Sequence, residues 1–250
     1  MKRTQQKTNT KVPAKIKQGD KELCVSSYTI TDSPIKTNNN NQFNKLPRVV
    51  RDQVEDIYDL ITSDPKQAIE KLLVLKEAYP QAPVLYNHLS AAYNRGGNYK
   101  AQRELVIENY LKNPDYHFAK VNYAQLCLDN GDFEKIPEIF DHKFDLKLLY
   151  PQRNTFHITE FAGFTGVMCA YYCSIGEKGE AQLLFDSLQE LTPESNMVNY
   201  AKGFLYPSLT TKLQRWVYKK RQKHANKLET QGQKEAHDYS LEAWNFAIIL

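Results

Sequence analysis

Glycine, methionine and tryptophan are scarce in this chain, with 10, 3 and 2 residues among 250. Leu, Ala, Glu, Lys and Gln dominate the middle of the sequence, and this composition favours an all-helical class. The chain has no run of about 20 apolar residues, the length that spans a bilayer. No apolar stretch near its start resembles a signal peptide. We therefore expect no membrane span and a cytoplasmic location, although delivery by a specialised secretion system would leave no such mark.

The sequence also lacks the motifs of common enzymes. It contains no P-loop, GxGxxG, GxSxG or HExxH. The four cysteines do not have the dense spacing of a disulfide framework, so a reduced compartment is the simplest interpretation. No CxxC or HxxxH stands near them, and a structural zinc site needs four ligands. We predict no enzymatic activity, no cofactor and no metal site.

Two local pairs could still carry chemistry. Cys169 and Cys173 are four residues apart, so one helix face could present both thiols. Two small core residues are the commoner outcome for such cysteines. His157 and Glu160 would place a base and an acid on one helix face. One such pair without a nucleophile is not an active site.

The clearest positive signal is a spacing of 34 residues. The segment Gly97-Asn98-Tyr99 recurs as Gly131-Asp132-Phe133, and Pro80 recurs as Pro114. Because glycine tolerates positive φ without steric cost, each segment predicts a turn between two helices. One helical hairpin cannot bury its own apolar face, so a repeated hairpin predicts stacked neighbours.

Side chains within the unit follow a recognisable order. The helix before the first glycine turn carries a large aromatic residue, a leucine, a small residue and a tyrosine on one face: Tyr86, Leu89, Ser90 and Tyr93. A later stretch has a tyrosine, an alanine, an aromatic residue and a proline at matching separations: Tyr172, Ala181, Phe185 and Pro193. This order and period resemble the tetratricopeptide repeat, a family of helix–turn–helix units.

The resemblance implies an all-α fold, an α-solenoid over residues 47–193. Four tetratricopeptide-like units are expected, at about 47–80, 83–114, 117–141 and 157–193. An insertion is expected near 143–156, because Gly176 follows Gly131 by 45 residues instead of 34. Pro137 should kink or end the second helix of the third unit near Ile136, since it removes a backbone hydrogen bond.

Charge divides the chain differently. Residues 1–50 hold 10 Lys and Arg against 3 Asp and Glu, residues 51–199 hold 14 against 22, and residues 200–250 hold 9 against 4. The first 46 residues are basic and poor in apolar side chains, which predicts a disordered arm. Within that arm, Glu22 to Ile30 has strand propensity. The alternative is a short extended segment that docks in a groove of this protein or of another.

Residues 194–250 are expected to form C-terminal helices, both capping and basic. The fourth unit carries several small residues on its first helix, Gly163 and Gly166 among them. We expect the apolar segment Trp244 to Leu250 to cover that small-residue face, because a solenoid needs its last apolar face covered.

The resemblance also implies a function: a non-enzymatic protein-interaction module, an adaptor or chaperone-like binder. Tetratricopeptide arrays bind a peptide or partner helix on a concave surface, here lined by Asn87, Asn94, Arg95, Phe118, Val121, Asn122, Gln125 and Asp129. One subfamily captures chaperone C-termini with a clamp of Lys, Arg and Asn. Four of its positions hold Gln53, Ile57, Phe118 and Asn122 here, so that ligand is not expected.

The alternative is a nucleic-acid-associated protein that acts through its basic ends. The run from Lys212 to Lys227 has seven positive and no negative side chains. Such a stripe can neutralise phosphates. The contacts would come from Lys219, Lys220, Arg221 and Lys223. The identity of a protein or peptide partner and the tendency to form homo-oligomers stay open.

Overall fold

The structure is a computed structural model, which describes residues 10–18, 21–33 and 42–209. The chain divides into two units, Met1–Leu205 and Tyr206–Leu250. Only residues 206–209 of the second unit are described. The expected cap at Trp244 to Leu250 therefore lies outside the described residues.

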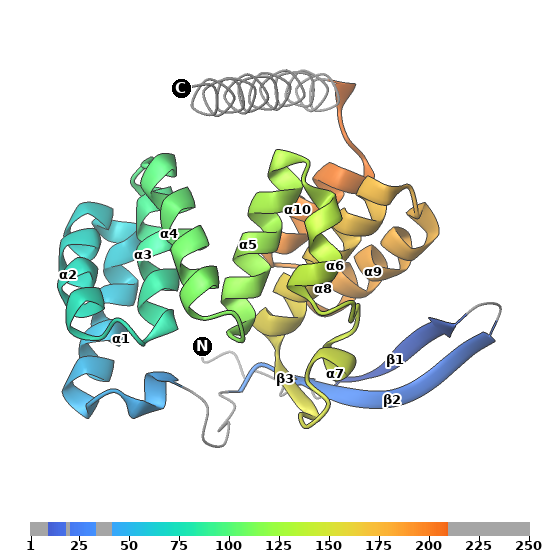
Figure 1. Cartoon of the computed structure of the whole chain (residues 1–250), viewed down its shortest axis with the longest axis horizontal. Coiled ribbons are helices and arrows are strands. Elements are labelled where there is room, and N and C mark those ends of the chain that lie inside the picture. The colour runs from blue at the N-terminus through green and yellow to red at the C-terminus, as the bar shows by residue number, and fades with distance from the viewer. Residues whose placement is uncertain (1–9, 19–20, 34–41, 210–250) are drawn as a thin grey trace, which may run out of the picture. The chain divides into compact units, whose positions relative to one another are not determined.

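The described part of the first unit is mostly helical, as the sequence predicted (Figure 1). Helices that follow one another along the chain pack side by side. The α-helices are α1 (Arg48–Ser63), α2 (Pro65–Ala78), α3 (Pro83–Arg95), α4 (Tyr99–Lys112), α5 (His117–Asn130), α6 (Ile136–Ile139), α7 (Leu146–Leu149), α8 (Ile158–Ile175), α9 (Lys178–Leu191) and α10 (Asn196–Leu205). No helix of the described ranges is long and apolar enough to cross a membrane.

The turns between helices fall where the glycine spacing placed them. Gly97, Gly131 and Gly176 have φ values of 75°, 81° and 93°, in the left-handed region that favours glycine. The first turn has no glycine. There the Asp64 carboxylate accepts the Gln67 backbone N–H at 3.1 Å and caps α2, with proline as its first residue.

The predicted core face of α3 is buried. Leu89 is fully buried and Tyr86 is 1% exposed, in a cluster shared with α1, α2 and α4. The Tyr86 hydroxyl donates to the carbonyl of Pro80 at 3.1 Å, so the aromatic position of one hairpin is fastened to the end of the preceding one. Tyr93 is only half-buried at the edge of the same cluster.

The third hairpin departs from the others. A 3₁₀ segment, Phe133–Lys135, precedes α6, and Pro137 lies in the first turn of α6. The second helix is therefore reduced to two short pieces, with the break beside Ile136 as expected. Buried Lys120 of α5 donates to the Ile139 carbonyl at 2.7 Å, which satisfies an acceptor at the end of α6.

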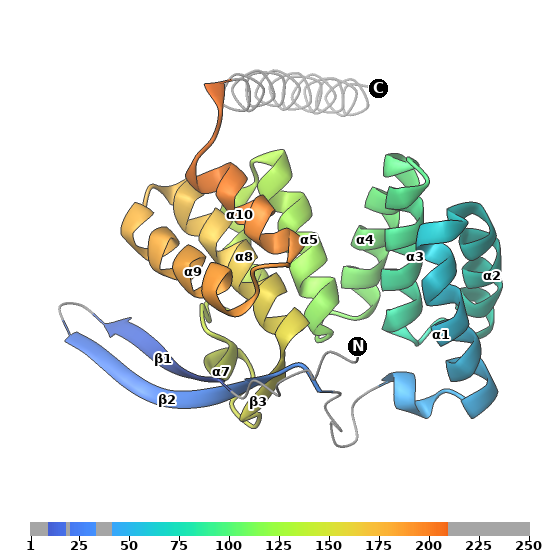
Figure 2. The ribbon, with the colours of Figure 1, turned by 180° about the vertical axis from the view of Figure 1, so that it is seen from behind.

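Three strands form a sheet that the sequence did not predict (Figures 1 and 2). Strands β1 (Thr10–Gln18) and β2 (Lys21–Thr31) pair antiparallel, and β3 (Thr155–His157) pairs parallel to the end of β2. The expectation of a disordered arm over residues 1–46 does not hold for these strands. The docked alternative does hold, because Tyr28 and Ile30 are buried in the core. The expected insertion supplies α7 and most of β3.

The small-residue face of α8 is covered by helices of the first unit. A Cβ on Gly163 would lie 3.2 Å from Val121 Cγ1 of α5, and a Cβ on Gly166 would lie 2.6 Å from Met197 Cε of α10. The trough predicted for the C-terminal tail is thus filled by Val121 and Met197.

A valine at Gly166 should test this close approach. The added side chain would overlap Met197, whose Cβ lies 3.0 Å from the position of a Cβ on residue 166. Gly166→Val should therefore destabilise the protein by about 1–3 kcal/mol, the usual cost of overpacking a core. Denaturant unfolding followed by circular dichroism would measure the cost. Gly179→Val is the control, because a Cβ there meets nothing within 4 Å. Equal effects of the two substitutions would contradict the packing of α10 on α8.

Candidate functional site

The eight residues predicted to line a binding groove lie on α3 and α5. They do not form one open surface. Asn87 belongs to an amide network: its Oδ1 accepts from Asn109 and Asn122, each at 3.2 Å, and its Nδ2 donates to the Tyr116 hydroxyl at 3.3 Å. Asn109 on α4 is 2% exposed and in turn accepts from Asn113 at 3.0 Å. The network therefore holds the side chains of Asn87 and Asn122 in fixed positions between α3, α4 and α5.

The side chains of three of the eight residues contact neighbouring helices. Val121 is buried against Gly163, so its assignment to the groove is wrong. Gln125 donates to the Met197 thioether at 3.4 Å, and Asp129 accepts from the Tyr200 hydroxyl at 3.3 Å. Both partners lie on α10, which packs against α8 (Figure 2). Helix α10 therefore contacts the C-terminal part of the predicted groove, where Gln125 is half-buried and Asp129 stays exposed.

The remaining predicted residues stay accessible. Asn94 and Arg95 are exposed at the end of α3, and Phe118 and Asn122 of α5 are half-buried. The Phe118 ring packs edge-on against Tyr116, with ring centroids 5.8 Å apart. The open part of the predicted surface therefore lies over α3 and the beginning of α5.

Tyr58 of α1 and His88 of α3 form a further aromatic pair that the sequence patterns did not indicate. Tyr58 is 62% exposed and meets His88 of α3 edge-on, with ring centroids 5.5 Å apart. Burial lowers the pKa of His88 to about 4, so its ring is neutral at pH 7. We call Tyr58, His88, Asn94, Arg95, Phe118 and Asn122 the α1–α3–α5 face.

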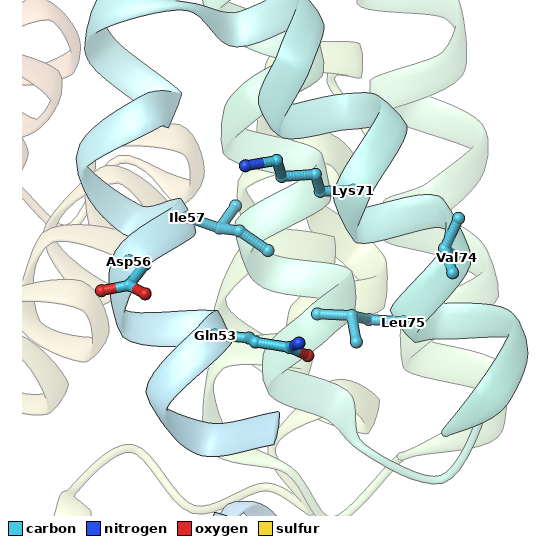
Figure 3. Close-up of a pocket in the computed structure, with 6 residues that line it drawn as sticks. All are labelled: Gln53, Asp56, Ile57, Lys71, Val74 and Leu75. Carbon is cyan, nitrogen blue, oxygen red and sulfur yellow. The ribbon is translucent and has the colours of Figure 1, made fainter. Parts of the chain in front are cut away.

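Gln53 and Ile57 lie elsewhere. Figure 3 shows them in a pocket of about 340 Å³ between α1 and α2, with side chains from both helices around it. The lining residues are Gln53, Asp56, Ile57, Lys71, Val74 and Leu75. Tyr58 meets α3 instead. The repeat positions that paired Gln53 and Ile57 with Phe118 and Asn122 are therefore shifted on α1.

A buried polar cluster joins α5 to the insertion and to α8. His117 Nε2 donates to the Glu160 carbonyl at 3.1 Å, so Nδ1 is free to accept from the Tyr150 hydroxyl at 3.3 Å. Burial lowers the pKa of His117 to about 4, although the nearby Glu160 carboxylate opposes that shift. A neutral ring with both nitrogens bonded is structural, and nothing in the cluster presents a nucleophile.

The two pairs singled out for chemistry have structural roles. His157 and Glu160 form a capping box at the start of α8, where Glu160 Oε2 accepts the His157 backbone N–H at 2.9 Å. Cys169 is buried, and its thiol donates to the Ala181 carbonyl at 3.3 Å. Among the described residues, no group of three or more His, Cys, Asp or Glu could hold a metal ion. Lys219, Lys220, Arg221 and Lys223 lie outside the described residues, so their predicted nucleic-acid contacts stay a prediction.

Comparisons of the chain with protein-family models, with curated proteins and with solved structures found no match.

Proposed function

We propose that the hairpins form a tetratricopeptide-like α-solenoid that serves as a non-enzymatic protein-interaction module. Its α1–α3–α5 face would bind a peptide or a partner helix. The observation that carries the proposal is the amide network, which holds Asn87 and Asn122 beside an accessible aromatic and basic surface. Side chains that are already held in place lose little entropy when a ligand binds.

The chemistry of the face suggests what it would recognise. Tyr58 of α1 offers an exposed ring, and Arg95 is exposed at the end of α3. Aromatic and arginine side chains are the types that carry most binding energy at protein interfaces. Amide groups such as Asn94 and Asn122 can bond to the backbone of an extended or helical peptide. A partner with an apolar anchor and an acidic side chain would fit this combination.

Substitution of the two anchor residues tests the proposal. Tyr58→Ala with Arg95→Glu should abolish capture of a specific partner by the full-length protein in a pull-down. Loss of one interface anchor typically costs more than about 2 kcal/mol, a thirtyfold drop in affinity. Both residues are exposed, so circular dichroism of the variant should match that of the wild type.

The control makes the same two kinds of change on another surface. Tyr99→Ala with Lys100→Glu alters an exposed tyrosine and an exposed cation of α4. It should retain every partner that the wild type captures. A partner retained by both variants, or lost by both, would count against the α1–α3–α5 face as the binding surface.

A further inference from the structure

Residues Tyr28 to Asp32 occupy a groove on the helical part of the first unit. The Thr29 backbone N–H donates to the Asn154 carbonyl at 2.9 Å, and Thr29, Ile30 and Thr31 pair in parallel with the three residues of β3. His157 Nε2 lies 3.3 Å from the carbonyl oxygen of Asp32, a separation of 125 residues along the chain. The docked segment and its groove are thus remote in sequence. Figures 1 and 2 both show α7 and β3 beside β2.

Two side chains anchor the docked segment. Tyr28 is 5% exposed and Ile30 is 3% exposed, and both belong to the larger core cluster. The Tyr28 ring meets Phe156 edge-on, with ring centroids 5.2 Å apart and an interplanar angle of 80°. Thr29 and Thr31 alternate with the anchors and stay partly exposed. The two buried positions are thus filled by an aromatic residue and, two positions later, by a branched aliphatic residue.

Bonds within the insertion also fix the loop that leads into β3. Asp145 caps α7 by accepting the Lys147 and Leu148 backbone N–H groups at 2.7 and 3.3 Å. Lys147 Nζ donates to the carbonyls of Pro151 and Arg153 at 2.7 and 3.0 Å. The strand that receives Tyr28 to Asp32 is therefore held in place by residues of the insertion itself.

We propose that the groove formed by α7, β3 and the start of α8 is a peptide-binding site, and that Tyr28 to Asp32 is its resident occupant. Its ligands are extended peptides with an aromatic residue followed two positions later by a branched aliphatic residue. Addition of a strand gives affinity through the backbone, and pockets for alternate side chains give specificity. This site goes beyond the proposed function, because it shares no residue with the α1–α3–α5 face.

The resident segment competes with any such ligand. It belongs to the same chain as the groove, so its effective concentration there is high. The apparent affinity for an external peptide is reduced by the fraction of molecules in which the groove is open. Weakening the resident anchors should therefore strengthen binding of an added peptide.

A labelled peptide tests the site on the full-length chain. The probe is a fluorescent peptide of residues 25–33, VSSYTITDS, added to the Tyr28→Ala, Ile30→Ala variant. Fluorescence polarisation should show saturable binding. Binding to the wild type should be at least about tenfold weaker, as expected if its groove is open in a tenth of the molecules or fewer.

Two controls show which results would contradict the proposed peptide site. The same peptide with Tyr28→Ser and Ile30→Ser should not bind. The Tyr99→Ala, Ile107→Ala variant, which loses the same residue types at exposed positions, should behave as the wild type. Absence of binding to a variant whose circular dichroism shows folded helices would overturn the proposal. Equal binding of the two peptides would overturn it as well.

Hydrogen exchange on the wild type gives an answer even if that variant does not fold. An exchangeable occupant must open without unfolding α8, as local openings of native proteins do. The Thr29 amide should therefore exchange faster than the amides of Val167 and Met168, which are fully buried in α8. Exchange of the Thr29 amide at the same slow rate would show a segment that leaves only on global unfolding, and the groove would then not accept another peptide.

Discussion

Leu89→Ala should lower the free energy of unfolding by roughly 2–5 kcal/mol, the range for truncating a buried leucine. Leu89 has no exposed surface and lies in the cluster that joins α1 to α4. For a chain of this size each kcal/mol shifts the melting temperature by about 2–4 °C. The expected decrease is therefore easily measured by thermal or denaturant unfolding followed through helical circular dichroism.

Leu111→Ala is the matched control. Leu111 lies on α4 and is 72% exposed, so the same truncation should change stability by less than about 0.5 kcal/mol. The other, larger core cluster does not include Leu89. It is made of Tyr28, Ile30 and side chains between Val121 and Phe204. Hydrogen exchange should consequently show the greatest loss of protection in α1 to α4. Similar effects of the two alanine substitutions would mean that the apolar face of α3 has been misassigned.

The turns and the core face of α3 could be predicted because their causes are local. A turn at a glycine with positive φ depends on only a few neighbouring residues. The spacing of 34 residues between the turns then predicted which helices follow one another along the chain. Leu89 and Tyr86 followed from helix periodicity alone, since the buried side of an amphipathic helix can be read from the sequence.

The strands could not be assigned in the same way. The sequence from Glu22 to Ile30 has strand propensity, but the partner of its last residues is Thr155–His157. Strand pairing depends on a complementary edge, and here that edge lies in an insertion that breaks the repeat pattern. Composition favoured disorder because the first 46 residues are basic. The buried pair Tyr28 and Ile30 supplies enough apolar surface for local docking all the same.

The error in the groove prediction, at Val121, comes from packing between helices. Repeat position assigned Val121 to an open surface, and a surface is open only if nothing packs on it. Small residues of α8 predicted a close neighbour, which was correct, but they did not identify the neighbour. Val121 fills one of these gaps, and Met197 of α10 fills the other. Which helix covers a face is a property of the tertiary packing.

Arg153→Ala should destabilise the protein by roughly 3–5 kcal/mol, the cost of removing one partner of a buried ion pair. Arg153 donates to both carboxylate oxygens of Glu160, at 2.9 and 2.6 Å. The two side chains are 25% and 13% exposed, so the lower end of the range is expected. The guanidinium carbon also lies 4.5 Å from the centre of the Phe156 ring, a contact that the alanine loses.

The effect should depend on pH in a defined direction. Burial alone would raise the pKa of Glu160, but the hydrogen bonds and charge of Arg153, together with the His157 backbone N–H, hold the pKa below its ordinary value of 4.5. A depressed folded-state pKa contributes stability that is present above the unfolded pKa and is lost as the pH falls through the folded pKa. In Arg153→Ala, the hydrogen bonds and charge of Arg153 are lost, so burial should raise the Glu160 pKa. The stability difference from the wild type should therefore be largest near pH 7. It should begin to shrink above pH 4.5, where Glu160 of the folded variant is protonated, and should continue to shrink below pH 4.5.

The double variant Arg153→Ala, Glu160→Gln separates charge from packing. Glutamine keeps an oxygen that can accept the His157 backbone N–H, so the cap of α8 survives, while no buried charge is left unpaired. It should recover part of the stability at pH 7 and should show little pH dependence from this site. If the single variant loses the same stability at pH 7 and at pH 4, the loss comes from packing on Phe156 and Tyr150, and the ion pair does not hold the insertion against α8.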